Sequence, residues 1–356
     1  NTHGIALPTN GIFNCIKKVE LLASGVTISS IDEYAKLVNL VLDADQSSDH
    51  QAGAASIQYG SGNNATDHLN EGARLDGGAT GAAAIYTTKF SMPLLLSCLT
   101  SSTKYIPLMG DELRIRITFN DFDDAFISGV RAATDIDFAG AKSSLTYSPV
   151  EMVMYKVQFS DLPMSLIRSN AQDKYTLILN NWTNSKGNVA VNQTSSVFQT
   201  GFNFTSASRV ILAFYPEYAG TSGLKKALAD TERHKITRKV SDYCFNVSGK
   251  NIPSQKLKSN QQGSEVLTEN KNSLRILGMA AANTFPGRNK TTIGTRHYEI
   301  DLESFKNYAD SDGVYSGIST IGQTSSVHVD YEAAGEACGA QLWCEHQIGL
   351  SLDMSP

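Results

Sequence analysis

Apolar and polar side chains alternate with a period of two in several separate stretches of this 356-residue chain. In the clearest stretch, 112–120, Leu113, Ile115 and Ile117 fall on one side of an extended backbone, and polar residues fall on the other. This pattern is typical of a β-strand with one buried face. Four further stretches show the same alternation: 153–159, 298–302, 327–331 and 348–354. The sequence therefore predicts an all-β fold.

Other stretches complete this outline. The run 209–215 is continuously apolar at its centre, which predicts a strand covered on both faces. Helical spacing is rare. One helix is predicted to begin at Ser30, because Glu33 follows at the spacing of a capping box, and a weaker one to cover 265–277. Three long polar stretches rich in small residues are expected to form surface loops: 43–80, 121–144 and 186–196.

The chain also contains an internal repeat. Segment 18–30 matches segment 242–254, since each has a strand, a Ser-Gly turn, an isoleucine and a serine two residues later. The elements predicted after each copy also share one order, namely a helix, a loop, a strand and then an alternating strand. This order indicates that one sandwich topology is written twice, in two tandem domains at 1–168 and 169–356.

The repeat is incomplete at its start. The first Ser-Gly turn already comes at Ser24, whereas a far longer stretch separates the domain boundary near Ser169 from the second turn at Ser248. If both copies share a fold, the first lacks its opening strands. We therefore expect the natural protein to extend upstream of Asn1.

Charge and cysteine content narrow the class of protein. A net charge of -5 argues against a surface built throughout to coat nucleic acid. One locally basic segment, 224–258, is interpreted as a solvated face. No stretch approaches the roughly 20 apolar residues of a membrane span. The five scattered cysteines are expected to be reduced and mostly buried, and they are Cys15, Cys98, Cys244, Cys338 and Cys344.

Metal and phosphate sites find little support. The histidines have no zinc-site spacing, and five residues separate Cys338 from Cys344, which fits no common metal knuckle. The stretch beginning at Asp43 imitates a calcium loop, but Ser48 replaces the glycine and Ala54 replaces the bidentate glutamate. Only an incidental surface cation remains open there. No phosphate-binding glycine loop and no nucleophile elbow occur.

Two carboxylate pairs could be imagined as a glycosidase pair, Glu299 with Asp301 and Asp330 with Glu332. We favour a solvated strand face for both, because the neighbouring positions alternate apolar. We therefore predict no catalytic residue, no cofactor site and no metal site.

The ordered motifs of the chain resemble those of double jelly-roll major capsid proteins of polinton-like viruses, virophages and adintoviruses. The first group is Ala6-Leu-Pro-Thr-Asn-Gly-Ile-Phe13, Val19-Glu-Leu-Leu22, Ile31-Asp-Glu-Tyr34, Phe90-Ser-Met-Pro-Leu94, Tyr105-Ile-Pro-Leu108 and Leu113-Arg-Ile-Arg-Ile117. The second group is Ser208-Arg-Val-Ile-Leu-Ala-Phe214, Val247-Ser-Gly-Lys-Asn-Ile-Pro253, Ile300-Asp-Leu-Glu303 and Ser316-Gly-Ile318. Each motif alone is degenerate, and their shared order along most of the chain carries the resemblance.

The resemblance implies two tandem jelly rolls with few short helices in loops. It also implies a structural, non-catalytic virion protein, assembled inside the host cell as a homotrimer with six rolls in a pseudo-hexagonal capsomer of an icosahedral shell. Its expected partners are neighbouring capsomers and penton or minor capsid proteins, without sequence-specific nucleic acid binding or a transmembrane segment. Two alternatives stay open. The second hypothesis is a secreted or surface glycan-binding pair of β-sandwiches, and the third is a β-sandwich glycosidase.

Overall fold

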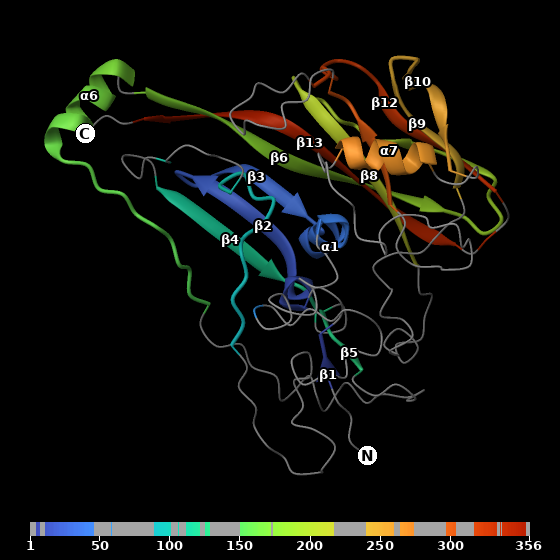
Figure 1. The fold of residues 1–356 in the computed structure, drawn as a ribbon, viewed down its shortest axis with the longest axis horizontal. Helices are drawn as coiled ribbons and strands as arrows, with labels where there is room; N and C mark the ends of the chain where they lie inside the picture. Colours follow the sequence, from blue (N-terminus) through green and yellow to red (C-terminus); the bar gives the residue numbers. More distant parts are fainter. Residues whose placement is uncertain are drawn as a thin grey trace, which may run out of the picture.

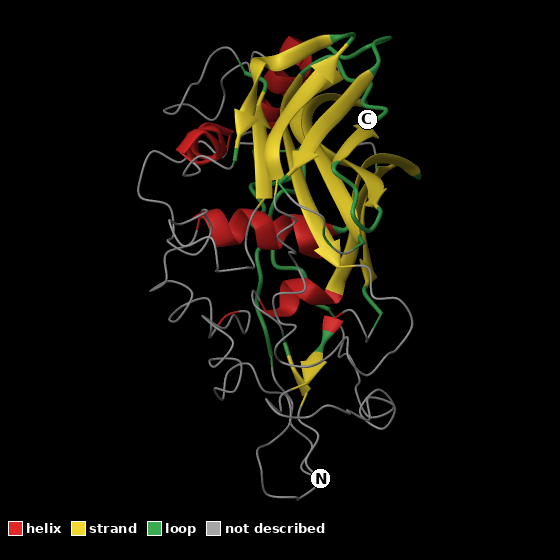
Figure 2. Ribbon diagram, turned by 90° about the vertical axis from the view of Figure 1, so that its right-hand side faces the viewer, coloured by secondary structure: helices red, strands yellow, loops and turns green. Residues whose placement is uncertain are grey.

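The computed structural model is built mainly from antiparallel sheets, with few helices (Figures 1 and 2). It describes residues 5–7, 11–45, 58, 89–100, 106, 112–121, 125–128, 150–171, 174–216, 240–259, 264–273, 297–303, 317–332, 335 and 337–353.

In the described ranges of the C-terminal half, eight strands follow one another. Their bounds are β6 Lys174–Val189, β7 Ser195–Gln199, β8 Ala207–Pro216, β9 Val240–Val247, β10 Lys250–Lys258, β11 His297–Asp301, β12 Ser325–Tyr331 and β13 Cys338–Asp353. They form two four-stranded sheets, ordered β11-β8-β13-β6 and β10-β9-β12-β7. The first strand thus pairs with the eighth, the second with the seventh, the third with the sixth and the fourth with the fifth. This nested pairing is that of a jelly roll.

A hydrophobic core fills the space between these two sheets. Aromatic rings dominate it, with Phe214 in edge contact with both Tyr298 and Tyr331. Val327 and Val329 from the opposite sheet are also buried there. Strands β11 and β12 contribute alternate residues to this core, as the period-two pattern predicted.

The N-terminal half contributes a smaller sheet and a helix. Among its described residues, the elements are β1 Ile5–Ala6, η1 Gly11–Cys15, β2 Ile16–Ala23, β3 Val26–Asp32, α1 Tyr34–Asp45, β4 Leu113–Phe119 and β5 Ile127–Ser128. The order of its main sheet is β3-β2-β4. Two further helices are α6 Asp161–Ala171 and α7 Ser264–Ser273.

The internal repeat is confirmed in three dimensions. Strands β3-β2-β4 are ordered as are β10-β9-β12, and a helix follows the hairpin in both halves. Both hairpins turn on two residues with positive φ. These are Ser24 at 45° with Gly25 at 82°, and Ser248 at 48° with Gly249 at 83°. Two successive left-handed residues form the turn whose twist matches antiparallel strands.

Several predicted boundaries were wrong. Residues 30–32 still belong to β3, and Glu33 has a positive φ of 54°, so α1 starts at Tyr34 rather than Ser30. The expected loop 186–196 is mostly strand, because β6 continues to Val189 and β7 begins at Ser195. Stretch 153–159 is extended and exposed and forms no strand. The other two predicted loops, 43–80 and 121–144, lie largely outside the described residues.

The division into domains at 1–168 and 169–356 stays a prediction, and its boundary falls within α6. All five cysteines are buried and none forms a disulfide, as expected. In the described part of the chain, the helices are too short or too polar to span a bilayer.

Candidate functional site: a sheet covered on both faces

Sheet β11-β8-β13-β6 is buried on both of its faces where it crosses the middle of the molecule. On β8, Val210, Leu212 and Phe214 point into the jelly-roll core. The intervening Ile211, Ala213 and Tyr215 point into a second cluster shared with the N-terminal half. The continuous apolar run 209–215 therefore meets hydrophobic neighbours on both sides, as predicted.

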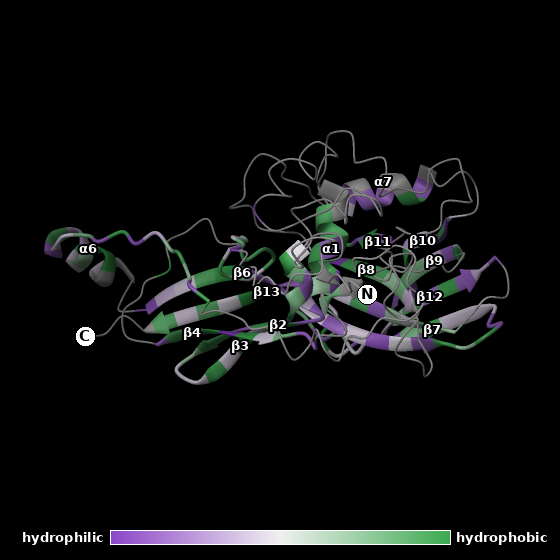
Figure 3. Ribbon diagram, turned by 90° about the horizontal axis from the view of Figure 1, so that it is seen from below, coloured by the Kyte–Doolittle hydropathy of each residue, from purple (hydrophilic) through white to green (hydrophobic). Residues whose placement is uncertain are grey.

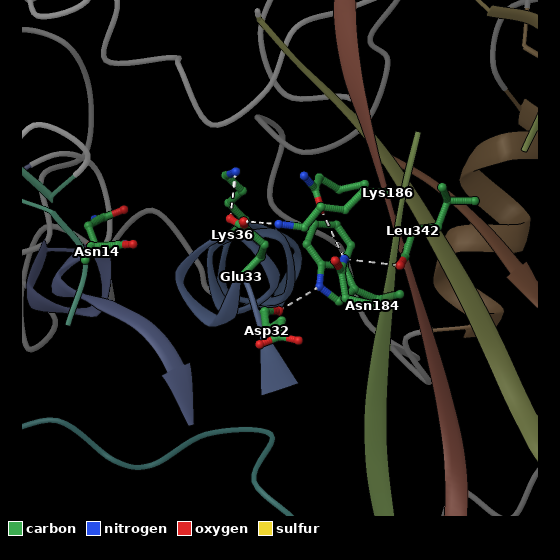
Figure 4. A network of polar contacts seen from close by, with 10 residues as sticks. Asn14, Asp32, Glu33, Lys36, Asn184, Lys186 and Leu342 are labelled. Carbon is green, nitrogen blue, oxygen red and sulfur yellow. Dashed lines mark hydrogen bonds and ion pairs between the residues drawn. The ribbon is translucent and has the colours of Figure 1, made fainter. Parts of the chain in front are cut away.

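The second cluster joins the two halves of the chain. Helix α1 supplies Tyr34, Leu37 and Val38, which pack with Trp182 of β6 and Trp343 of β13. Both tryptophans are almost completely buried. The indole nitrogen of Trp343 lies 3.4 Å from the carbonyl oxygen of Asp32, to which it donates (Figure 4).

The long ends of β6 and β13 form a third cluster. Leu177, Leu179, Leu350 and Leu352 pack there against Leu21 of β2. Strands that complete the C-terminal roll therefore also cover the apolar face of the N-terminal sheet. The C-terminal roll has its own core, and the two halves in addition share these two buried clusters.

A charged cluster borders this contact. The carboxylate of Glu33 accepts from Lys186 of β6 at 2.6 Å and pairs with Lys36 of α1 at 2.7 Å (Figure 4). Burial alone would raise the pKa of Glu33, but the two ammonium groups outweigh it and lower that pKa below its ordinary value. Lys36 also lies 5.0 Å from the ring centre of Tyr215. These contacts fix α1 to the sheet at its first turn.

A second polar cluster centres on His346 of β13. Its Nε2 lies 3.0 Å from the hydroxyl of Thr183 and 3.4 Å from the amide nitrogen of Asn181, whose side-chain oxygen accepts from Ser29 at 2.6 Å. The imidazole stacks on Phe204 with ring centres 3.6 Å apart. Burial lowers the pKa of His346 to about 4. The ring is therefore neutral near pH 7, where Nε2 can accept a hydrogen bond.

A buried ion pair lies across β8 and β13. Arg209 and Glu345 approach to 2.7 Å with about a tenth or less of each side chain exposed. The guanidinium also donates to the carbonyl of Ser273 at the end of α7 and lies 4.8 Å from the ring centre of Trp182. The charge is thus compensated by a carboxylate, a carbonyl and an aromatic face.

Helix α7 closes the outer edge of β11 with side chains. Asn270 donates to the carbonyl of His297 and accepts from the amide of Glu299, while Glu269 accepts from the amide of Asp301. The Glu299 carbonyl accepts from the hydroxyl of Tyr243. The edge groups of this strand are therefore bonded without another strand.

The carboxylates weighed as catalytic candidates lie in different surroundings. Glu299 is fully buried and pairs with His297 at 2.7 Å, so its predicted solvated position was wrong, because α7 covers that face. Asp301 lies beside it at the end of β11. Across the roll, Asp330 pairs with Lys256, and Glu332 is exposed beyond β12.

The structure places few residues of the calcium-like stretch and of the basic segment. Asp43 and Asp45 fall in α1, and the remainder of the calcium-like stretch lies outside the described residues. No cluster of metal-ligating side chains occurs within the part of the chain that the structure describes. In the basic segment, Lys250 is exposed on β10, and residues 224–239 lie outside the described ranges.

Comparison with known proteins identifies the fold. No protein-family model and no curated protein matches the sequence. The PBCV-1 virus capsid, a quasi-atomic model, is similar with a TM-score of 0.56 and 10% identity, over 98% of this chain and 86% of that one. Crystallographic PBCV-1 VP54, fitted into a reconstruction of the virophage Sputnik, gives 0.54 and 10% over the same shares. The Faustovirus major capsid protein gives 0.50 and 8%, over 98% and 74%.

These similarities confirm the predicted fold class. The chain has an all-β double jelly-roll fold, and its resemblance to double jelly-roll capsid proteins holds at the level of the fold. The signal in the sequence was the ordered repeat. The polar contacts between the halves had no such signal, because they join residues more than a hundred positions apart.

Proposed function

We propose that the chain is a viral major capsid protein, a structural subunit of the virion shell with no catalytic role. One observation carries the proposal: the double jelly-roll fold extends over 98% of the chain in its similarity to the PBCV-1 capsid structure. Identity is only 10%, so the inference rests on architecture and not on individual residues.

The packing supports a role under mechanical stress. A sheet covered on both faces ties the two halves through tryptophans, leucines and a buried ion pair. Closely packed interiors have low compressibility and transmit strain. A subunit with this construction can therefore keep its shape when neighbours press on it from several sides.

The finer arrangement follows from the same proposal. Three copies would place six rolls side by side in a pseudo-hexagonal capsomer, with closed symmetry. Such capsomers would tile an icosahedral shell inside the host cell, in contact with one another and with penton or minor capsid proteins. With a net charge of -5, any contact with the genome would be local and not sequence-specific.

The test is assembly of the purified chain. Light scattering after size-exclusion chromatography should give a mass about three times 38.4 kDa, and negative-stain images should show triangular or hexagonal blocks that form sheets or shells. A strictly monomeric protein that is retained on a glycan array would instead favour the glycan-binding alternative and would refute the proposal.

A further inference from the structure

Strand β7 is an edge strand of the C-terminal roll. It ends sheet β10-β9-β12-β7 and pairs on one side only, with β12. Figure 3 shows β7 at the border of this sheet, beyond β12. Exposed and buried residues alternate along it, and Val197 at its centre is 55% exposed. No strand that the structure describes pairs with the side of β7 that faces away from β12.

The pairing with β12 determines which backbone groups face this free edge. The amide of Tyr331 donates to the carbonyl of Thr194 before β7, and the amide of Thr200 donates to the carbonyl of Ser325 after it. Hydrogen-bonded and non-hydrogen-bonded pairs alternate along an antiparallel ladder, so residues 196 and 198 bond to β12 as well. The N–H and C=O groups of residues 195, 197 and 199 therefore point away from β12.

Most of these outward groups have no hydrogen-bond partner in the described part of the chain. The exception is the carbonyl of Ser195, which accepts from the side chain of Gln193 at 2.8 Å. A carbonyl oxygen has two lone pairs and can accept a second hydrogen bond. Together with Val197 and Gln199, Ser195 therefore presents a row of backbone groups that an additional strand can pair with.

The other edges of the two four-stranded sheets are guarded. Helix α7 covers β11, and β6 lies beside β3, whose Ser29 donates to Asn181. Strand β10 carries Pro253 and exposed lysines at positions 250, 256 and 258. Covers, lysines and prolines of this kind prevent a sheet edge from pairing with another chain. Around β7, by contrast, residues 187–208 include no charged residue and no proline.

We propose that the edge of β7 pairs with the edge of β7 in a second copy of the chain, antiparallel about a twofold axis at Val197. In this register, Val197 lies opposite Val197 of the partner subunit, and Ser195 lies opposite Gln199 of the partner subunit. Every opposed residue directs its backbone groups outward, so each of the three pairs makes two hydrogen bonds, or about six in all. Two four-stranded sheets thereby become one continuous sheet.

The uncharged edge favours a second copy as the partner. Antiparallel pairing of identical strands brings each side chain close to its own counterpart, and like charges at such positions are destabilising. The exposed face of β7 carries Ser195, Val197 and Gln199, which can meet themselves without charge repulsion. A strongly charged partner would gain no ion pair along 187–208.

The number of hydrogen bonds indicates a small interface. At about one hydrogen bond per 100–200 Å², six bonds correspond to roughly 600–1,200 Å² of buried surface, which is the size of weak contacts. The pairing is therefore weak between two isolated copies and becomes strong where many copies are joined. A twofold contact differs from the threefold contact of the proposed capsomer and would link one capsomer to the next. The inference thus goes beyond the proposed function, and either can fail alone.

Cysteine cross-linking of the full chain tests the pairing. Opposed residues of a hydrogen-bonded pair have Cα atoms about 5.5 Å apart, within the range of a disulfide. Oxidised glutathione should therefore convert Val197→Cys largely into covalent dimers. All five native cysteines are buried, which keeps the background low. The matched control is Val191→Cys, because Val191 is 61% exposed and lies in the turn before β7, away from the axis, so it should form few dimers.

Two further variants test the register. Ser195→Cys and Gln199→Cys lie opposite each other in the proposed pair, so an equal mixture of the two proteins should form dimers. Each variant alone should not, because its two thiols would be four residues apart along the strands, or about 14 Å. A parallel arrangement would give the reverse result.

A charge substitution tests the pairing without a cross-link. Val197→Lys places like charges beside each other across the axis and should weaken self-association about tenfold in sedimentation velocity. Val191→Lys should leave the association unchanged. Equal melting temperatures would show that both variants fold.

Three results would overturn the proposal. They are cross-linking of Val197→Cys no greater than that of Val191→Cys, cross-linking of Ser195→Cys with itself, and unchanged self-association of Val197→Lys. The mass of the uncross-linked particle separates this proposal from the proposed function. A trimer mass without cross-linking refutes the β7 pairing alone, whereas cross-linked pairs of monomers refute the capsomer alone.

Discussion

Removing the Trp343 side chain should destabilise both halves of the molecule together. Its ring is fully buried, meets Tyr215 edge-on with ring centres 6.4 Å apart, and donates to the Asp32 carbonyl. Truncating a buried aromatic residue to alanine costs about 3–5 kcal/mol, because apolar contacts are lost and a cavity remains. We expect Trp343→Ala to lower the free energy of unfolding by about that amount. Trp343→Phe should cost less, since a ring still fills most of the site.

Guanidinium unfolding, followed by circular dichroism and by the fluorescence of the remaining Trp182, measures the change. A matched control is Ile178→Ala on β6 of the same sheet, which is 64% exposed and should cost less than about 0.5 kcal/mol. Hydrogen exchange supplies the second readout, because protection in α1 and β2 should fall along with that in β13. A loss of unfolding free energy below about 1 kcal/mol, or unchanged protection in α1, would contradict the claim that Trp343 stabilises both halves.

Three further substitutions test single features. The pKa of His346 is about 4 in the folded chain and about 6.5 in the unfolded chain, so protonation of this residue favours unfolding. The free energy of unfolding should therefore fall by on the order of 3 kcal/mol between pH 6.5 and pH 4, and should change little below pH 4. His346→Gln should flatten that dependence in denaturant titrations, and an unchanged slope would exclude His346 as its source. Lys186→Met should raise the lowered pKa of Glu33 toward its ordinary value, as measured by a carbon-13 NMR titration. The control Lys250→Met, on exposed β10, should leave the pKa of Glu33 unchanged. Equal effects of the two substitutions would contradict a direct ion pair between Lys186 and Glu33. Gly317→Ala should lower the melting temperature more than Gly249→Ala. A Cβ at position 317 would lie 2.5 Å from the backbone oxygen of Ala207, whereas at position 249 only the positive φ disfavours alanine, at a cost of about 1 kcal/mol. The reverse order of melting temperatures would contradict the packing around Gly317.

The sequence predicted those features that local chemistry determines. Alternation located β4, β11, β12 and the end of β13, and a continuous apolar run located the two-faced β8. The Ser-Gly pairs located both hairpins, because glycine adopts positive φ without a steric cost. Repeating these local signals in one order was enough to predict the fold class.

Features that depend on distant partners were missed. Stretch 153–159 alternates as a strand does, but a strand also needs hydrogen-bonding neighbours, which the pattern alone cannot provide. Glu299 shares the pattern of a solvated face and is buried because α7 covers it. The helix predicted from Ser30 begins later, because pairing of β3 with β2 holds residues 30–32 in the sheet.

The closed edge of β11 limits how copies of the chain can meet. An added strand would have to replace four hydrogen bonds that Asn270, Glu269 and Tyr243 make to backbone groups of β11. It would also have to displace α7, which Arg209 holds through the Ser273 carbonyl. Natural sheets use such covers against edge-to-edge association. On the proposed function, contacts between copies at this side of the roll would therefore use side chains and loops, so that neighbouring subunits would tile without fusing their sheets at this edge.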